Sequence, residues 1–198
     1  MRMRGLVVTV GALAVALTAV AARAELKIGD PAPKWSGLTG TDGAKHGLAD
    51  YADAKVLVVV FTCNTCPVAK AYQDRLIALQ KDYQPKGVRM VAINPNDIKG
   101  DKLDDMKTRA KEKGFNFAYL YDPTQQVGHD YGAQTTPHVF VFDKARKLAY
   151  VGGVDDAMDA KDVKAHYLRD ALDSLLAGKP PAKDTTPHPG CSIKYRKK

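Results

Sequence analysis

Cys63 and Cys66 are the residues with the clearest capacity for chemistry, and they frame the motif Cys63-Asn64-Thr65-Cys66-Pro67. The apolar run 55–61 before them predicts a buried strand, and the pattern from Val68 onward predicts a helix. The first turn of a helix offers unpaired N–H groups and a partial positive charge, which stabilise a thiolate, the reactive form of cysteine. A second thiol one turn away can close a disulfide on the first. The spacing therefore predicts a redox-active pair, in which Cys63 is the exposed nucleophile and Cys66 resolves the mixed disulfide.

A structural disulfide and half of a zinc site are the other interpretations of a Cys-x-x-Cys motif. A zinc site needs a further pair of ligands, and the sequence contains neither a second Cys-x-x-Cys nor a His-x-x-x-His. The redox interpretation is therefore favoured. It carries two requirements: the two sulfurs must lie close enough to bond, and a thiol or a peroxide must be able to reach them.

A β-α-β unit is expected around the cysteines, because an apolar strand, an amphipathic helix and a second apolar strand follow one another. Before this unit, the turn Gly40-Thr41-Asp42-Gly43 predicts a short edge hairpin, against which Trp35 and Leu38 should pack. The proline-rich, polar segment from Lys179 is expected to be irregular. The expected elements are strands at 55–61, 88–93, 117–121, 139–142 and 148–151, and helices at 68–83, 102–113, 125–131 and 163–176.

Two polar features follow the second of these strands. The turn Asn94-Pro95-Asn96-Asp97 lies at its carboxyl end, the edge at which open α/β sheets bind ligands. Ordinary turn chemistry is the simpler explanation of the same residues. Asp101 is in position to cap the helix expected over 102–113.

The segment 1–24 has the pattern of a secretory signal peptide. Arg2 and Arg4 precede an uncharged apolar run, and Ala22-Arg23-Ala24 is a small-x-small cleavage site. Cleavage after Ala24 would lower the formal charge from +8 to +5. The product would be periplasmic or secreted, without a stable membrane anchor, although an uncleaved anchor is the alternative. An oxidising compartment is compatible with disulfide chemistry.

The remaining sequence suits a single domain over residues 25–178, followed by the basic tail 179–198 that carries Cys191. Positive charge forms a run only at 194–198, and no aromatic–basic pattern of the kind that binds nucleic acid is present. Three cysteines are too few for a scaffold built on disulfides, and the odd count leaves Cys191 without an assigned role.

The order of these elements, with Thr136-Pro137 before the last hairpin, resembles the thioredoxin fold over residues 28–178. The cysteine motif, the turn at 94–97 and the tail Gly190-Cys191-Ser192-Ile193-Lys194 resemble the peroxiredoxin-like branch of the redoxin and alkyl hydroperoxide reductase/thiol-specific antioxidant families. The resemblance implies an α/β fold, with a central mixed sheet flanked by helices and an amino-terminal hairpin extension.

The same resemblance implies roles for residues on both sides of the dithiol. Thr136-Pro137 matches the cis-proline of the fold, which leaves the Thr136 backbone free to pair with an incoming peptide. Asn64, Thr65 and Pro67 would help to position the substrate and tune the thiolate. No cofactor is implied. The implied partners are protein thiols or disulfides, or a thioredoxin-like electron donor, with no nucleic acid.

Three functions stay open at this point. The first is an exported thiol–disulfide oxidoreductase that works through the Cys63–Cys66 couple. The second is a thiol peroxidase in which Cys66 is oxidised by peroxide and Cys63 resolves it. The peroxiredoxin signature threonine is missing, because Cys63 occupies its position, and Pro137 stands where the peroxide-binding arginine is expected, with Arg146 nearby in a turn.

The third function is a copper-binding module, because two thiolates and a histidine suit Cu(I), with His138 or His129 as the added ligand. Metal binding is not the favoured interpretation. Cys191 is a candidate accessory thiol. It either folds back onto the site, packs without a redox role, or pairs with another chain.

Overall fold

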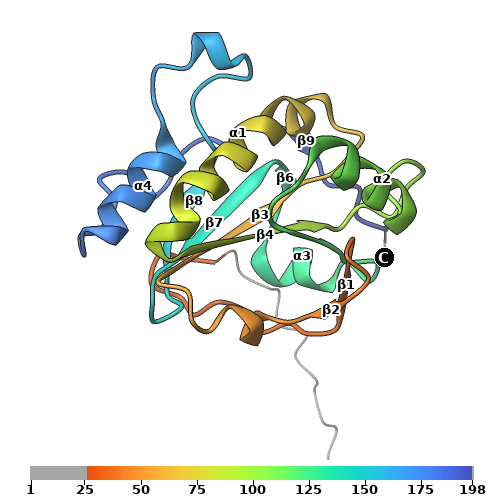
Figure 1. Ribbon diagram of the computed structural model, residues 1–198, viewed down its shortest axis with the longest axis horizontal. Coiled ribbons are helices and arrows are strands. Elements are labelled where there is room, and N and C mark those ends of the chain that lie inside the picture. The colour runs from red at the N-terminus through yellow and green to blue at the C-terminus, as the bar shows by residue number, and fades with distance from the viewer. Residues whose placement is uncertain (1–25, 198) are drawn as a thin grey trace, which may run out of the picture.

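The computed structural model describes residues 26–197, so the predicted signal peptide 1–24 lies outside the described residues. A seven-stranded mixed sheet with the order β2-β1-β5-β4-β3-β7-β8 forms the centre of the fold, and helices cover both of its faces (Figure 1). The predicted α/β architecture is therefore confirmed. The elements are β1 (Leu38–Gly40), β2 (Lys45–His46), β3 (Val56–Phe61), α1 (Pro67–Tyr83), β4 (Val88–Asn94), α2 (Leu103–Lys113), β5 (Ala118–Tyr121), α3 (Gln126–Tyr131), β6 (Thr135–Thr136), β7 (His138–Phe142), β8 (Leu148–Gly152), α4 (Tyr167–Leu176) and β9 (Cys191–Ser192), with 3-10 turns at Leu48–Tyr51, Gln84–Lys86 and Ala160–Asp162.

β3 is the central strand, and it delivers the chain to the cysteine motif. It pairs in parallel with β4 and antiparallel with β7, and all six of its residues are buried. A strand covered on both faces needs apolar residues throughout, which is why its sequence shows a continuous run rather than an alternation. The carboxyl end of β3 and the start of β7 meet at one sheet edge, since Phe61 pairs with His138. This edge carries Cys63 and Thr136.

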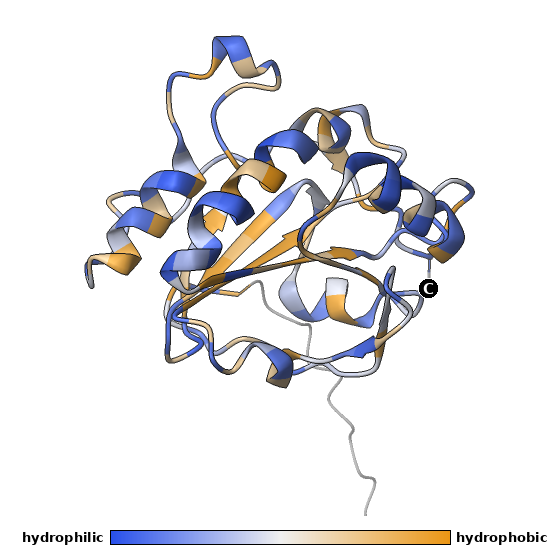
Figure 2. Cartoon of the chain, in the orientation of Figure 1, coloured by the Kyte–Doolittle hydropathy of each residue, from blue (hydrophilic) through white to orange (hydrophobic). Residues whose placement is uncertain are grey.

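The alternation of side chains along β3 divides the apolar core into two layers. Val56, Val58 and Val60 pack with residues of α1 and α4 on one face. Leu57, Val59 and Phe61 pack on the other face with Tyr131 of α3 and with the amino-terminal segment. Figure 2 shows the apolar strands enclosed between helices whose outer surfaces are hydrophilic. The site is thus built on the most buried strand of the molecule.

The amino-terminal hairpin is confirmed. β1 and β2 pair antiparallel around the Gly40–Gly43 turn, and β1 also pairs with β5, so the hairpin extends the main sheet. Gly43 has a φ of 82°, a conformation that glycine adopts without strain. Trp35 and Leu38 are buried, as expected.

The final helix is shorter than predicted. It begins at Tyr167 rather than at Val163. The carboxylate of Asp156 accepts hydrogen bonds from the backbone N–H groups of Lys164 (2.9 Å) and Ala165 (3.0 Å), and these bonds hold the preceding residues in a loop. Apolar periodicity alone does not reveal such a loop.

The carboxyl-terminal tail departs from the predicted irregular conformation at one short strand. Most of it lacks regular structure, but Cys191–Ser192 forms β9, which pairs antiparallel with β6. Ile193 is buried in the core layer that contains Tyr131. The tail is therefore an integral part of the domain and lies across the sheet edge that carries the cysteines.

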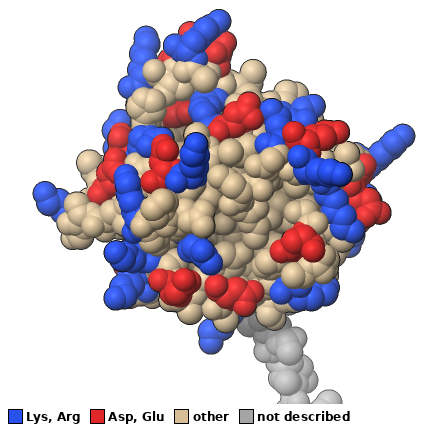
Figure 3. Space-filling view, viewed as in Figure 1, with Lys and Arg blue, Asp and Glu red and all other residues tan. Residues whose placement is uncertain are grey.

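The exposed surface has a mixed charge. On the face shown in Figure 3, lysine and arginine side chains are interspersed with aspartate and glutamate rather than gathered into a basic stripe. Within residues 26–197, none of the helices is both long enough and apolar enough to cross a membrane.

Burial of Ile193 should make the tail a substantial source of stability. We expect Ile193→Ala to lower the free energy of unfolding by about 2–5 kcal/mol, because the change leaves a cavity in the core. Ile28→Ala is the matched control, since Ile28 is 42% exposed and its truncation should cost no more than about 0.5 kcal/mol. Urea denaturation of the two variants measures the difference. Equal costs would show that the tail does not pack as described.

Candidate active site

Cys66 is the N-cap residue of α1. The helix starts at Pro67, and the Cys66 sulfur accepts a hydrogen bond from the backbone N–H of Ala69 at 3.4 Å. Proline at the first helical position costs nothing there, because its missing N–H would have no partner within the helix. Cys66 therefore takes the place usually held by serine or aspartate, with its sulfur at the positive end of the helix dipole.

Cys63 lies three residues before Cys66 in the chain and packs in the same buried cluster. Its sulfur lies 3.3 Å from the hydroxyl of Thr136. Cys63, Cys66 and Ala69 form one buried cluster, against which Cys191 packs. All three cysteines are free thiols, so the structure represents the reduced protein.

The prediction that Cys63 is the exposed nucleophile is wrong. Cys63 is 1% exposed and Cys66 is 3% exposed, whereas Cys191 is partly exposed. Burial raises the pKa of the Cys63 thiol, and hydrogen bonds from Thr136 and from the Cys66 backbone only partly offset it. At neutral pH Cys63 is thus the less reactive thiol of the motif.

Cys66 has the opposite electrostatic balance. Burial acts to raise its pKa, but hydrogen bonds from the Cys191 side chain and from the backbone N–H groups of Ala69 and Cys191 outweigh this effect, so its pKa lies below the ordinary value. The pKa of Cys191 is raised to about 11, first because its thiol is hydrogen-bonded to Cys66 and then because of burial. Of the two thiols, Cys66 is therefore the one that ionises at lower pH.

The peptide bond between Thr136 and Pro137 is cis, as the resemblance implied. The Thr136 carbonyl oxygen lies 3.2 Å from the Cys66 sulfur. However, the expectation that the Thr136 backbone is free for an incoming peptide is wrong, because Thr136 is already paired with Cys191 of β9. The tail of the chain occupies the position at which a substrate strand was expected.

Asp101 holds the cysteine loop in place. Its carboxylate accepts hydrogen bonds from the backbone N–H groups of Asn64 (2.7 Å) and Thr65 (3.1 Å) and from the Thr65 hydroxyl (2.7 Å). The side chain is fully buried. The predicted capping role is therefore wrong, and Lys102 occupies the N-cap position of α2. Three donors from one loop explain why a carboxylate is tolerated in the interior.

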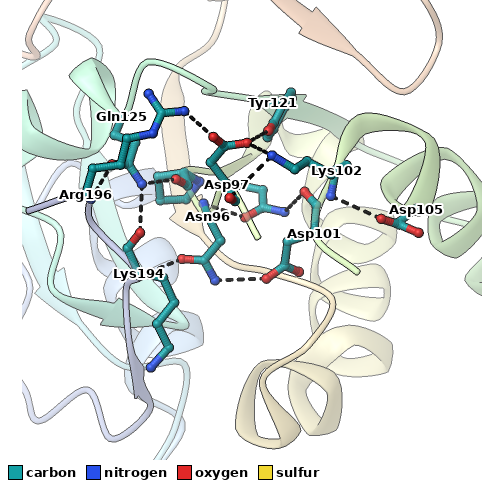
Figure 4. A network of polar contacts seen from close by, with 11 residues as sticks. Asn96, Asp97, Asp101, Lys102, Asp105, Tyr121, Gln125, Lys194 and Arg196 are labelled. Atoms are coloured by element: carbon teal, nitrogen blue, oxygen red, sulfur yellow. Dashed lines mark hydrogen bonds and ion pairs between the residues drawn. The ribbon is translucent and has the colours of Figure 1, made fainter. Parts of the chain in front are cut away.

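The turn after β4 does more than reverse the chain. Asn94 donates to the Asp101 carbonyl at 3.0 Å and accepts from the Asn96 backbone N–H at 3.0 Å. Asn96 donates to the Asp101 carboxylate at 3.0 Å and accepts from the Lys194 backbone N–H at 2.8 Å (Figure 4). The sequence predicted that this turn lies at the edge of the sheet where ligands bind. In the structure, the turn binds the carboxyl-terminal tail of the same chain.

Gln125 is the second side chain that binds the backbone of the tail. Its side-chain amide donates to the carbonyl groups of Pro95 (2.8 Å) and Lys194 (2.9 Å), and its oxygen accepts from the Arg196 backbone N–H (2.8 Å). Asp97 forms ion pairs with Arg196 and Lys102 (Figure 4). Sequence reasoning missed Gln125 and assigned other roles to Asn96 and Asp101, because most of their partners lie far away in the chain.

The remaining predicted site residues have clear places. Asn64 donates to the Gly100 carbonyl at 3.0 Å and accepts from the Tyr119 hydroxyl at 3.1 Å, so its side chain braces the loop from inside. Thr65 and Pro67 are exposed beside the buried sulfurs. They are therefore available to contact a partner, whereas Asn64 is committed to the scaffold.

Two other predicted features lie elsewhere. The Arg146 guanidinium donates to backbone carbonyls, including that of Ala54 at 3.0 Å, and lies at the opposite end of β7 from the cysteines. His138 is buried and stacks on His188 with ring centroids 3.7 Å apart, and burial lowers its pKa to about 3. His129 stacks on Tyr195. Among residues 26–197, no group of three or more histidine, cysteine, aspartate or glutamate side chains is arranged to hold a metal ion.

Removing the charge of Asp101 should loosen the cysteine loop. We expect Asp101→Asn to lower the free energy of unfolding by about 1–3 kcal/mol, since an amide cannot accept at both of its ends. Asp104→Asn on the exposed side of α2 is the control and should change little, because its side chain is 94% exposed. Denaturant unfolding reports both values. An Asp101→Asn variant as stable as the control would contradict the bracing role.

The hydrogen bond from Cys191 should set the ionisation of Cys66. In the reduced protein we expect a thiolate step below the ordinary value of 9.0, from Cys66. Cys191→Ala removes a donor to the charged form, so this step should move to higher pH. Cys191→Ser keeps a donor and should shift it less. Ultraviolet absorbance of the thiolate during a pH titration measures the effect, and an unchanged step in Cys191→Ala would contradict the assignment.

Comparison with known proteins agrees with this geometry. The chain is 39% identical to an uncharacterized conserved protein from Geobacillus kaustophilus whose crystal structure superposes with a TM-score of 0.82, over 87% of this chain and 94% of that one. It is 28% identical over 134 residues to the thiol:disulfide interchange protein HelX of Rhodobacter capsulatus, which is 66% of this chain and 66% of that protein.

A Mycobacterium tuberculosis protein that carries the name peroxiredoxin is 30% identical over 109 residues, or 53% of this chain. The chain spans just under two thirds of the length of these two curated relatives, 66% and 63%. The sequence pattern of the AhpC/TSA family matches residues 28–151, which include the cysteine motif, the bracing Asp101 and the cis-proline. With its mixed sheet, flanking helices and paired thiols, the chain belongs to the AhpC/TSA family of thioredoxin-fold proteins.

Proposed function

We propose that this protein is a thiol–disulfide oxidoreductase whose redox couple is the Cys63–Cys66 dithiol and disulfide. The observation that carries the proposal is the position of Cys66, a cysteine with a lowered pKa that caps a helix beside a second buried thiol. The thiolate is the form that attacks disulfides, and the neighbouring thiol is the group that releases the product.

The reaction is an exchange in two steps. The Cys66 thiolate forms a mixed disulfide with a sulfur of the substrate disulfide, and the other substrate sulfur leaves as a thiolate that takes up a proton. Cys63 then loses its proton, attacks the Cys66 sulfur and releases the second substrate thiol. The protein ends with a Cys63–Cys66 disulfide, and the substrate disulfide has become two thiols. This assignment reverses the roles expected from sequence, because Cys66 has the lower pKa.

A thiol peroxidase is the second candidate, and the same thiolate supports it. A stabilised Cys66 thiolate could be oxidised to a sulfenate, which would condense with Cys63. Against this, the threonine hydroxyl at the site lies on Cys63, and Arg146 lies at the far end of the sheet. The geometry therefore favours disulfide exchange.

We propose that the exchange occurs outside the cytoplasm. The signal-like pattern of residues 1–24 supports export, and a disulfide couple suits an oxidising compartment. The substrates would be protein or small-molecule disulfides, and the electron donor a thioredoxin-like protein.

Equilibration of the reduced protein with glutathione buffers of graded potential tests the function. We expect one transition, which peptide mapping assigns to a Cys63–Cys66 disulfide and which Cys66→Ser and Cys63→Ser both lose. A reduction potential of about −270 mV would make the protein a reductant, and a reduction potential of about −120 mV would make it an oxidant. Failure to form this disulfide at any potential would refute the proposal. Consumption of hydrogen peroxide much faster than any disulfide would replace it with the peroxidase alternative.

A further inference from the structure

The buried dithiol raises a question of access. Neither Cys63 nor Cys66 is exposed by more than 3%, yet a redox couple must exchange electrons with something outside. Cys191 packs against the cluster of Cys63, Cys66 and Ala69, and among the described residues it is the one cysteine that is not buried. A substrate that approaches the folded protein therefore meets Cys191 first.

Cys191 is held in register with the dithiol by strand pairing. In the β6–β9 ladder, Thr136 lies opposite Cys191 and Thr135 lies opposite Ser192. Thr136 precedes the cis-proline and lies against both motif cysteines, through its hydroxyl to Cys63 and its carbonyl to Cys66. The pairing brings the sulfur of Cys191 onto Cys66, as a substrate cysteine would be brought by an incoming strand.

The tail is anchored on both sides of Cys191. After it, Ile193 is buried in the core, and its backbone N–H bonds to the Gln134 carbonyl at 2.9 Å. Asn96 and Gln125 hold the next residues, as Figure 4 shows. Before it, the buried Thr186 bonds through its backbone N–H to the Val151 carbonyl at 3.1 Å. These contacts hold β9 in place on both sides of Cys191.

Gly190, the residue before β9, shows how closely the tail approaches the backbone of Thr136. A Cβ atom added at Gly190 would lie 2.4 Å from the Thr136 carbonyl oxygen and 2.8 Å from its carbon. These are backbone atoms of the site and cannot move aside cheaply. Only glycine allows this distance, so the residue before Cys191 is part of the arrangement.

We propose that Cys191 is a third redox thiol, which forms a disulfide with Cys66 and connects the buried Cys63–Cys66 couple to an external disulfide of low molecular weight. The proposal rests on the function proposed above, names its substrate class, and makes Cys191 rather than Cys66 the thiol that first attacks the external disulfide. A small disulfide is specified because β9 already occupies the edge of β6 that an extended peptide would need.

The steps balance in sulfur bonds, protons and electrons. Cys191, whose proton passes to the Cys66 thiolate, attacks the external disulfide and expels one thiolate. Cys66 gives this proton to that leaving thiolate and attacks the Cys191 sulfur, which expels the second thiolate. Cys63 then attacks Cys66, frees Cys191 as a thiolate and closes the Cys63–Cys66 disulfide. The proton of Cys191 thus supplies the first external thiol and the proton of Cys63 supplies the second, and the freed Cys191 thiolate takes up a proton from solvent. In the net reaction, one external disulfide is reduced to two thiols, and Cys63 and Cys66 are oxidised to one disulfide.

Oxidised glutathione added to the reduced full chain tests the proposal, with disulfides mapped by mass spectrometry. In Cys63→Ser, where the last step is blocked, we expect an intramolecular Cys66–Cys191 disulfide. In Cys191→Ser we expect the Cys63–Cys66 disulfide to form at least about ten times more slowly than in the wild type, because the exposed thiol is missing. Both results are required, and the absence of either overturns the proposal.

Two further variants test whether the position of the third thiol matters, or only its presence. The double variant Cys191→Ser, Ser192→Cys moves the thiol one residue along β9, to the opposite side of the strand, and should not restore the rate. Gly190→Ala leaves all three thiols in place and forces β9 away from Thr136, so it should slow oxidation as Cys191→Ser does. Restoration by the first variant, or a wild-type rate in the second, contradicts the proposal.

Failure of this inference differs from failure of the proposed function. A wild type that forms no Cys63–Cys66 disulfide refutes the function. A wild type and a Cys191→Ser variant that form it at the same rate leave the function intact and remove Cys191 from the route.

Discussion

The hydrogen bonds to the sulfur of Cys66 are the interaction on which the rest of the site depends. A negative charge inside a protein is costly unless donors surround it, and here the amide of Ala69 and the groups of Cys191 supply them. One set of donors belongs to the start of α1 and the other to the end of the chain. The reactive form of the cysteine therefore depends on two segments that are far apart in sequence, and the fold must bring them together.

Two structural features meet this requirement. The first is the all-apolar strand β3, whose burial on both faces fixes where the chain emerges and where α1 begins. The second is the polar network of Asp101 and Asn96. Asp101 binds the cysteine loop, and Asn96 binds both Asp101 and the backbone of Lys194. Asp101 and Asn96 therefore connect the cysteine motif to the tail through their hydrogen bond to each other. A displacement of the tail would displace the cysteine motif as well.

The sequence predicted what depends on local pattern. The strands, the first helix, the edge hairpin and the cysteine pair all follow from apolar periodicity and turn residues, and the cis-proline followed from the resemblance. It did not predict what depends on distant contacts. The pKa order of Cys63 and Cys66 is set by the burial of Cys63 and by the hydrogen bonds of Cys191 and Ala69 to Cys66, and Asp101 finds its partners in another loop. A polar tail looks irregular when its hydrogen-bond partners are backbone groups and amides over sixty residues away.

The short strand in the tail also explains why the prediction of an exposed Cys63 is wrong. A thioredoxin-like site with a free cis-proline edge would leave one motif cysteine open to solvent. In this chain the edge is filled by β9, so both motif cysteines are covered and the exposed thiol is the one on the covering strand. Covering a thiolate protects it from unproductive oxidation, because oxidation follows thiolate character and exposure together. The same covering would halt exchange if the strand carried no sulfur. Under the proposal made above, the cysteine of β9 that packs against Cys66 reconciles a covered thiolate with exchange at the proposed redox couple.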